Sequence, residues 1–186
     1  MKRNFMFTAI LSLFVFAVAA SAQTTNFGGT WTLDTAKSKL DERARIESQT
    51  LTVTQTDKDI SVATVTKRTP SPAGSPGGQG GGGGLGRGGG FGGGDATATY
   101  SLDGKETTVE QESQAGKIPV KLKAKIDGGK LSLSSSRTFS TPNGEISTST
   151  KETWSLSTDG NTLTVEQTRT TPRGDNSSTM VYSKKP

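Results

Sequence analysis

The sequence contains no cysteine and no histidine among its 186 residues. Without cysteine, disulfide bonds and thiol catalysis are excluded. Without histidine, imidazole acid-base catalysis, a Ser-His-Asp triad, haem ligation through His and the usual zinc sites are excluded too, so we expect no metal and no cofactor. A chain that has no cross-links must be held together by burial, and the sequence therefore predicts a true hydrophobic core.

Apolar residues are scarce as well, at 29%, and many of them lie near the N-terminus. Lys2 and Arg3 precede an apolar run from Phe5 to Ala20, and small residues follow at 20–22. This pattern is typical of a signal peptide over residues 1–22 that is cleaved before Gln23. The alternative is a membrane anchor, but about 16 apolar residues fall short of the roughly 20 that a spanning helix needs. We expect a periplasmic or secreted protein with no membrane span after cleavage.

The remainder, residues 23–186, has the length of a single domain. Removing residues 1–22, which hold two of the 22 Lys and Arg residues, lowers the formal net charge from +5 to +3. This charge is too small to call for nucleic acid as a partner. We expect a monomer that binds no nucleic acid.

Glycine is concentrated in one segment. Between residues 77 and 94, 14 of 18 positions are glycine, and proline and serine flank the run. Such a segment has almost no side chains to bury and loses the most entropy on ordering, so we predict a disordered, flexible loop insertion over 69–95. A linker between two domains is the alternative, but residues 23–68 are too few for an independent core.

Elsewhere apolar and polar residues alternate, as Leu51 and Val53 do with Thr52 and Thr54. A period of two is typical of strands with one buried face, and Asp-Gly and Asn-Gly pairs between them indicate hairpin turns. One short helix is predicted over 38–47, where Ser38 and Asp41 have a capping-box-like spacing. The predicted strands are 29–34, 49–56, 59–68, 96–102, 105–112, 117–127, 129–139, 145–157, 161–170 and 177–184.

An aromatic residue and a leucine two positions later, followed by a strand that contains a glutamine, recur three times along the chain. The parity of the strands points the three glutamines, together with three charged residues, toward the apolar face. One interpretation is a polar lining of a ligand-binding cavity; the other is that these side chains lie at strand ends, where water reaches them. Arg137 and Glu152 are also candidates for pairing across adjacent strands. The candidate ligand-binding residues are Gln55, Gln111, Arg137, Glu152, Gln167 and Arg169.

The segment Gly29-Thr30-Trp31 at the start of the first strand, followed by a ladder of hairpins, resembles the lipocalin and fatty-acid-binding (calycin) group. The resemblance implies an all-β, antiparallel up-and-down barrel of about 8–10 strands, with Gly29 and Trp31 as a motif that closes one end. It does not extend to the Arg-x-Tyr motif that holds a carboxylate in fatty-acid-binding members, because Met180 precedes Tyr182 by two.

The function that fits best is exported, non-catalytic binding of a small apolar or amphipathic molecule. The main alternative is an exported structural or protein-interaction module with a filled barrel. A hydrolase would need two converging carboxylates, and the closely spaced acids Asp57 and Asp59, or Glu110 and Glu112, are more typical of a solvated strand face. Arg173-Gly174-Asp175 matches an integrin-binding tripeptide, and it is also ordinary turn chemistry.

Overall fold

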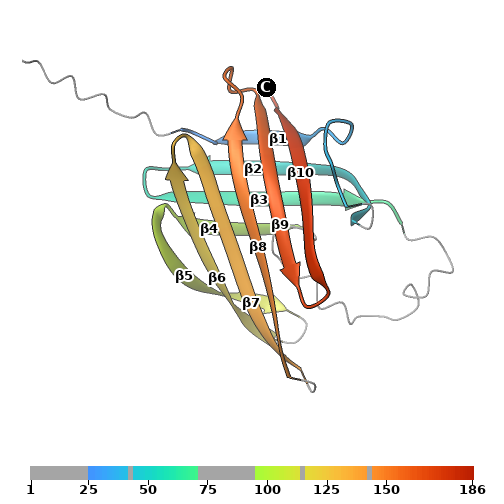
Figure 1. Ribbon diagram of the computed structural model, residues 1–186. Coiled ribbons are helices and arrows are strands. Elements are labelled where there is room, and N and C mark those ends of the chain that lie inside the picture. Colours follow the sequence, from blue (N-terminus) through green and yellow to red (C-terminus); the bar gives the residue numbers. More distant parts are fainter. Residues whose placement is uncertain (1–24, 42–43, 71–94, 114–115, 142–143) are drawn as a thin grey trace, which may run out of the picture.

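The computed structural model describes residues 25–41, 44–70, 95–113, 116–141 and 144–186. The predicted signal peptide, 1–22, and nearly all of the predicted glycine-rich insertion lie outside these residues. The described chain is all-β and has ten strands (Figure 1). They are β1 Gly29–Leu33, β2 Ile46–Gln55, β3 Asp59–Arg68, β4 Ala96–Ser101, β5 Asp103–Ser113, β6 Gly116–Asp127, β7 Lys130–Thr141, β8 Gly144–Leu156, β9 Thr162–Thr171 and β10 Gly174–Lys184.

The ten strands form one antiparallel sheet in the order β4-β3-β2-β1-β10-β9-β8-β7-β6-β5. Strands that are consecutive in the chain are neighbours in the sheet, except for β4 and β5, which form its two edges. Strand β1 pairs with β10 and joins the two halves of the sheet. Strands β1–β4 then cross behind β6–β10 (Figure 1). The sheet edges β4 and β5 are consecutive in the chain, so the sheet curls into a nearly closed barrel. The predicted up-and-down barrel is confirmed.

The observed strand ends agree closely with those predicted from the alternation of apolar and polar residues. Every strand boundary lies within three residues of the predicted range. On β6 the apolar Val120, Leu122 and Ala124 are buried, while the lysines between them are exposed. Gly128 and Gly129 both have positive φ, at 56° and 80°, which is the backbone that a tight two-residue turn between β6 and β7 requires.

The predicted helix over 38–47 is wrong. No α-helix occurs in the described part of the chain, and β2 already begins at Ile46. The segment after β1 runs along β10 instead, where Lys39 and Thr179 exchange two backbone hydrogen bonds of 2.7 and 2.9 Å. The Ser38 hydroxyl accepts from the backbone N–H of Val181 at 2.9 Å rather than capping a helix. Because β1 covers only the last residues of β10, the edge of β10 at 179–181 is satisfied by this segment.

One end of the barrel is closed by aromatic side chains. Phe27, Trp31 and Trp154 are fully buried. The indole N–H of Trp31 donates to the Phe27 carbonyl at 3.0 Å, and the Phe27 ring meets Trp154 edge-on at 6.3 Å. The Gln55 side chain holds the chain in front of β1, because it accepts from the Phe27 N–H and donates to the Thr25 carbonyl, both at 2.9 Å. This end lies opposite the β9–β10 hairpin, since β1 pairs with the last residues of β10.

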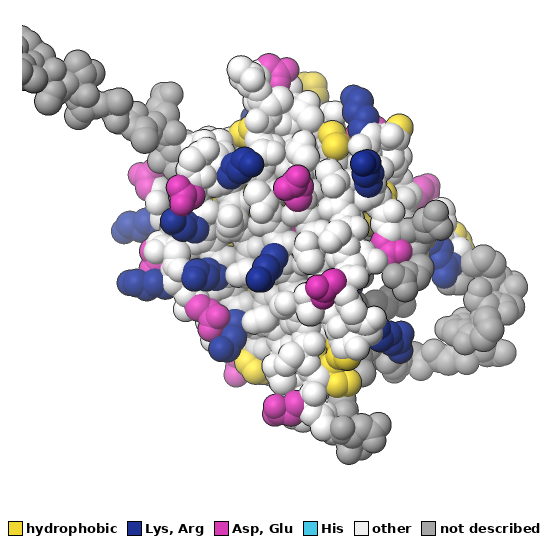
Figure 2. Space-filling model, in the orientation of Figure 1, with side chains coloured by type: hydrophobic (Ala, Val, Ile, Leu, Met, Phe, Trp, Pro, Cys, Tyr) yellow, Lys and Arg dark blue, Asp and Glu magenta, His cyan; other side chains and the backbone are white. Residues whose placement is uncertain are grey.

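The outer face of the strands is polar. Figure 2 shows basic and acidic side chains interspersed over it, with few apolar ones. Lys121 pairs with Glu106 at 3.1 Å and Lys117 with Glu110 at 3.4 Å, all four largely exposed. Exposed pairs of this kind contribute little to stability, and they identify Glu106 and Glu110 as solvated surface charges.

Candidate ligand-binding cavity

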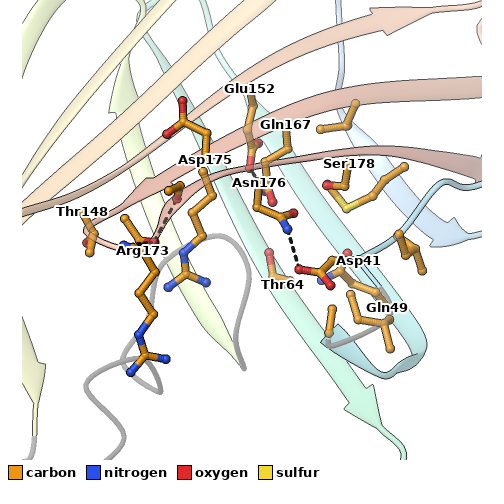
Figure 3. Close-up of a pocket in the computed structure, with 18 of the residues that line it drawn as sticks. Asp41, Gln49, Thr64, Thr148, Glu152, Gln167, Arg173, Asp175, Asn176 and Ser178 are labelled. Atoms are coloured by element: carbon orange, nitrogen blue, oxygen red, sulfur yellow. Dashed lines mark hydrogen bonds between the residues drawn. The ribbon is translucent and has the colours of Figure 1, made fainter.

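The barrel encloses a cavity of about 680 Å³ whose walls come from both halves of the sheet. The side chains that line it project from β2, β3 and β7–β10 and from the segment between β1 and β2 (Figure 3). The β9–β10 hairpin lies at its mouth, where residues 171–176 belong to the lining. The cavity therefore extends inward from the end of the barrel opposite to the aromatic plug.

Strand register arranges the wall of β7–β10 in layers. The innermost is apolar, and its members are Leu131, Trp154, Val165 and Met180. The layer above it holds Leu133, Glu152, Gln167 and Ser178. The third layer is wholly polar and consists of Ser135, Thr150, Arg169 and Asn176. The wall thus has an apolar floor with polar layers above it, and Phe139 and Ile146 add apolar lining nearer the mouth.

Glu152 is the acid of the middle layer. It is only 4% exposed, and it accepts from the indole N–H of Trp154 at 2.8 Å and from the amide of Gln167 at 2.7 Å. Burial raises the pKa of Glu152 to about 7, although these two hydrogen bonds act in the opposite direction. The carboxyl group therefore changes charge near neutral pH while lining the cavity.

A second polar feature of the cavity is a hydrogen bond that joins Tyr182 of β10 to Gln49 of β2. The hydroxyl of Tyr182 donates to Gln49 Oε1 at 2.6 Å and lies 3.3 Å from the sulfur of Met180. The amide of Gln49 donates to Thr66 at 2.8 Å. Burial raises the pKa of Tyr182, and the nearby charge of Glu152 raises it further, so this hydroxyl stays neutral.

Two arginines flank β8 on its inward face near the mouth. Arg137 lies opposite Thr148, and Arg169 lies opposite Thr150. The guanidinium of Arg137 stacks over the Phe139 ring at 5.2 Å, and its Nε is 3.4 Å from the Thr148 hydroxyl. Burial, and then repulsion from Arg169, lowers the pKa of Arg137. The mouth is therefore a region of crowded positive charge.

The other side of the mouth carries acids. Asp41, in the segment after β1, accepts from the Asn176 amide at 2.7 Å (Figure 3). Arg173 and Asp175 of the β9–β10 hairpin also line the opening. The Arg-Gly-Asp tripeptide therefore lies at the hairpin tip, as predicted, and forms part of the cavity rim.

The six predicted ligand-binding residues fall into four groups. Glu152, Gln167 and Arg169 line the cavity, and Arg137 lies beside it without being part of its lining. Gln55 is at the opposite end, where it holds Thr25 and Phe27. Gln111, on β5, pairs with Ile118 of β6 and is not part of the lining.

Arg137 and Glu152 are not cross-strand partners, because Glu152 lies opposite Leu133. The three similar hairpins thus place their glutamines in different surroundings.

Several lining residues were missed by the sequence analysis. Gln49 is buried, at 5% exposed, and shares the inward parity of Leu51 and Val53, so the same alternation could have identified it. Asp41 had no such signal, because its position depends on the contact with Asn176, 135 residues away. Thr148 and Ser178 also line the cavity, and their small polar side chains are common on both faces of these strands.

Neither an acidic cluster suited to a metal ion nor a helix suited to a membrane is found in the described residues. No cluster of three or more acidic side chains there is arranged to hold a metal ion. No helix in those ranges has both the length and the apolar character to cross a bilayer.

Comparisons with known proteins give structural likeness at low sequence identity. No protein-family model matches the sequence, and no curated protein matches it significantly. A zebrafish ileal bile acid-binding protein complexed with cholic acid is 17% identical, with a TM-score of 0.48 over 86% of this chain and 98% of that one. The fatty-acid-binding protein of Manduca sexta is 14% identical, with a TM-score of 0.42 over 84% of this chain and 97% of that one.

Secretory abundant heat soluble protein 4 from Ramazzottius varieornatus is 15% identical, with a TM-score of 0.48 over 87% of this chain and 96% of that one. At these values we assign the fold from the chain's own strand order and register, and we infer ligand binding from the cavity alone.

Proposed function

We propose that this protein binds a small amphipathic molecule inside its barrel and carries out no chemistry on it. The observation that carries the proposal is the cavity of about 680 Å³, closed at one end by the Phe27, Trp31 and Trp154 cluster. Ligand pockets are typically roughly 300–1,000 Å³ in volume, with apolar walls and a few polar groups. The layered wall has this character, and the alternative of a filled barrel does not fit a cavity of this size.

The amphipathic character of the ligand is inferred from the mixture of apolar and polar side chains along the wall. Leu51, Val165 and Met180 offer apolar surface at depth, whereas arginines and acids surround the mouth. A wholly apolar ligand would bury Glu152 and the Gln49–Tyr182 pair without new partners, which costs free energy. A ligand with both apolar and polar parts satisfies both kinds of wall.

The direct test is to block the cavity by a single substitution. Ser178 lines the cavity, and its neighbour Ser177 is exposed on the outer face of the same strand. We expect the fluorescent dye 8-anilinonaphthalene-1-sulfonate to bind the wild-type protein saturably. Ser178→Trp should weaken this binding roughly tenfold or more, and Ser177→Trp should leave it unchanged.

Circular dichroism spectra of both variants should match the wild type, which separates blocking from unfolding. Absence of saturable dye binding, or equal binding by the two tryptophan variants, would contradict the proposal. The non-catalytic part is tested separately, by recovering a bound ligand after prolonged incubation and finding its mass unchanged.

Export is a further part of the proposal, supported by Lys2 and Arg3, the apolar run from Phe5 to Ala20 and the small residues at 20–22. Thr25 and Phe27, which Gln55 holds at the closed end of the barrel, both lie after the expected cleavage site and would be kept in the mature chain. N-terminal sequencing of the protein from extracytoplasmic fractions should begin at Gln23. Recovery of the intact chain from the cytoplasm alone would refute export without affecting the proposal of ligand binding.

A further inference from the structure

Among the residues that the structure describes, the buried carboxyl group of Glu152 has hydrogen-bond donors around it but no cationic partner. Its two described hydrogen bonds come from an indole and an amide, which are both neutral donors. The cationic side chains at the cavity mouth are arginines, and none of them is among the groups that shift the pKa of Glu152. A buried carboxylate is costly unless a cation compensates its charge, so the described residues leave this compensation incomplete.

The acceptor positions of Glu152 that the described donors do not fill indicate which chemical group of a ligand would bind there. A carboxylate has about four acceptor positions, and the described donors take one on each oxygen. The nearby Tyr182 hydroxyl does not supply a third, because it donates to Gln49. A group rich in donors, positively charged and without acceptors of its own would complement this wall, and an ammonium group has this character.

Resting on the proposed function, we propose that the cavity selects an apolar amine, whose ammonium group binds Glu152 and whose hydrocarbon part lies along Leu51, Val165 and Met180. Glu152 sits directly above the apolar layer, because it is two residues from Trp154 on the inward face of β8. An amine seated there keeps its apolar part inside the barrel. The mouth also carries Asp41 and Asp175, which offset the arginines that a cation must pass.

The groups that face Glu152 limit what else can titrate there. Gln167 lies beside it on β9 and Leu133 on β7, and neither ionises. Tyr100 of β4 and Tyr182 of β10 interact with its charge, and burial raises the pKa of both hydroxyls, so both stay neutral over the accessible range. Amine binding should therefore follow the ionisation of Glu152 alone, strengthening as the pH rises through neutrality.

The experiment compares three ligands with the same ten-carbon chain and different head groups: decylamine, decanol and decanoate. Calorimetric titration of the full chain at about pH 8, below the micellar concentrations, should show decylamine binding roughly ten- to hundredfold more tightly than decanoate. Glu152→Gln should remove this preference and retain decanol binding. Glu166→Gln, which removes an exposed carboxylate from the outer face of β9, is the matched control and should behave as wild type.

Each outcome bears on a different proposal. If decanol binds but Glu152→Gln leaves the affinity for decylamine unchanged, or the wild type prefers decanoate, selection of an amine is overturned and ligand binding stands. If none of the three ligands binds, both proposals fail. Loss of the amine preference below about pH 6 in the wild type, and its absence at every pH in Glu152→Gln, would support the assignment.

Discussion

Replacing Glu152 with glutamine should make the protein more stable at alkaline pH and change its stability little at acid pH. The reason is that folding must bury the Glu152 carboxyl group, which is only 4% exposed. Glutamine is nearly the same size and can still accept from the Trp154 indole. The amide of Gln167 can turn so that its oxygen faces the new side chain, and the hydrogen-bond network is then kept.

The magnitude follows from the pKa of Glu152, which burial raises from 4.5 to about 7. Between these two values the folded protein binds more protons than the unfolded chain, so stability falls as the pH rises. A shift of this size corresponds to about 3 kcal/mol of unfolding free energy, fully lost once the pH exceeds the folded pKa. Below the unfolded pKa both states are protonated and the cost disappears.

The assay is equilibrium urea unfolding at about pH 4, 5.5, 7 and 8.5, followed by far-UV circular dichroism and by the fluorescence of Trp31 and Trp154. The difference between Glu152→Gln and wild type should grow by about 3 kcal/mol from the most acid to the most alkaline condition. Surface aspartates such as Asp34 and Asp159 have lowered pKa values because of hydrogen bonds, and they give an opposite trend. That trend is common to both proteins and cancels in the difference.

Glu166→Gln is the control, since its carboxylate is exposed on the same barrel wall. Its stability should follow wild type at every pH. A stability difference for Glu152→Gln that does not depend on pH, or that grows toward acid, would refute the argument that burial sets the titration of this group.

Two further predictions concern the closed end of the barrel. Gly29→Ala should cost about 1–3 kcal/mol of unfolding free energy, because φ is +139° there and a Cβ would lie 2.9 Å from Cε of Lys184. Gly104→Ala, with positive φ but open space around it, should cost less in the same urea titration, and an equal loss would argue against the contact. Gln55→Ala should lower the unfolding free energy by about 1–3 kcal/mol, because the bonds to Thr25 and Phe27 are lost. The N-terminal segment should then be cleaved by proteases earlier than in the wild type, and an unchanged rate of cleavage would contradict the prediction.

Much of the candidate site could be reached from strand parity. Glu152, Gln167 and Arg169 point inward because they share the parity of Trp154 and Val165, and a side-chain period of two holds along a regular strand. Parity does not say at which height of the barrel a residue lies. That is why Gln55, predicted with the same reasoning, turned out to hold the N-terminal segment at the closed end.

The helix was mispredicted for a related reason. Ser38 and Asp41 carry local capping signals, but their side chains bind Val181 and Asn176, more than a hundred residues away in the chain. The spacing of residues within a short segment carries no information about the open edge of β10, because that edge forms only when the barrel closes. Competition from such long-range hydrogen bonds outweighs the weak helix preference of a short segment.

By itself the sequence determined the all-β class, the ten strands and the side that each strand buries, because alternation and glycine turns act locally. The tertiary structure decided which strand ends meet, and with that the height of each polar side chain in the barrel. It placed Glu152 between a neutral indole and a neutral amide, away from the arginines that share its inward parity. The titration of that one carboxyl group near pH 7, and the amine that we propose it binds, are consequences of burial, which only the closed barrel creates.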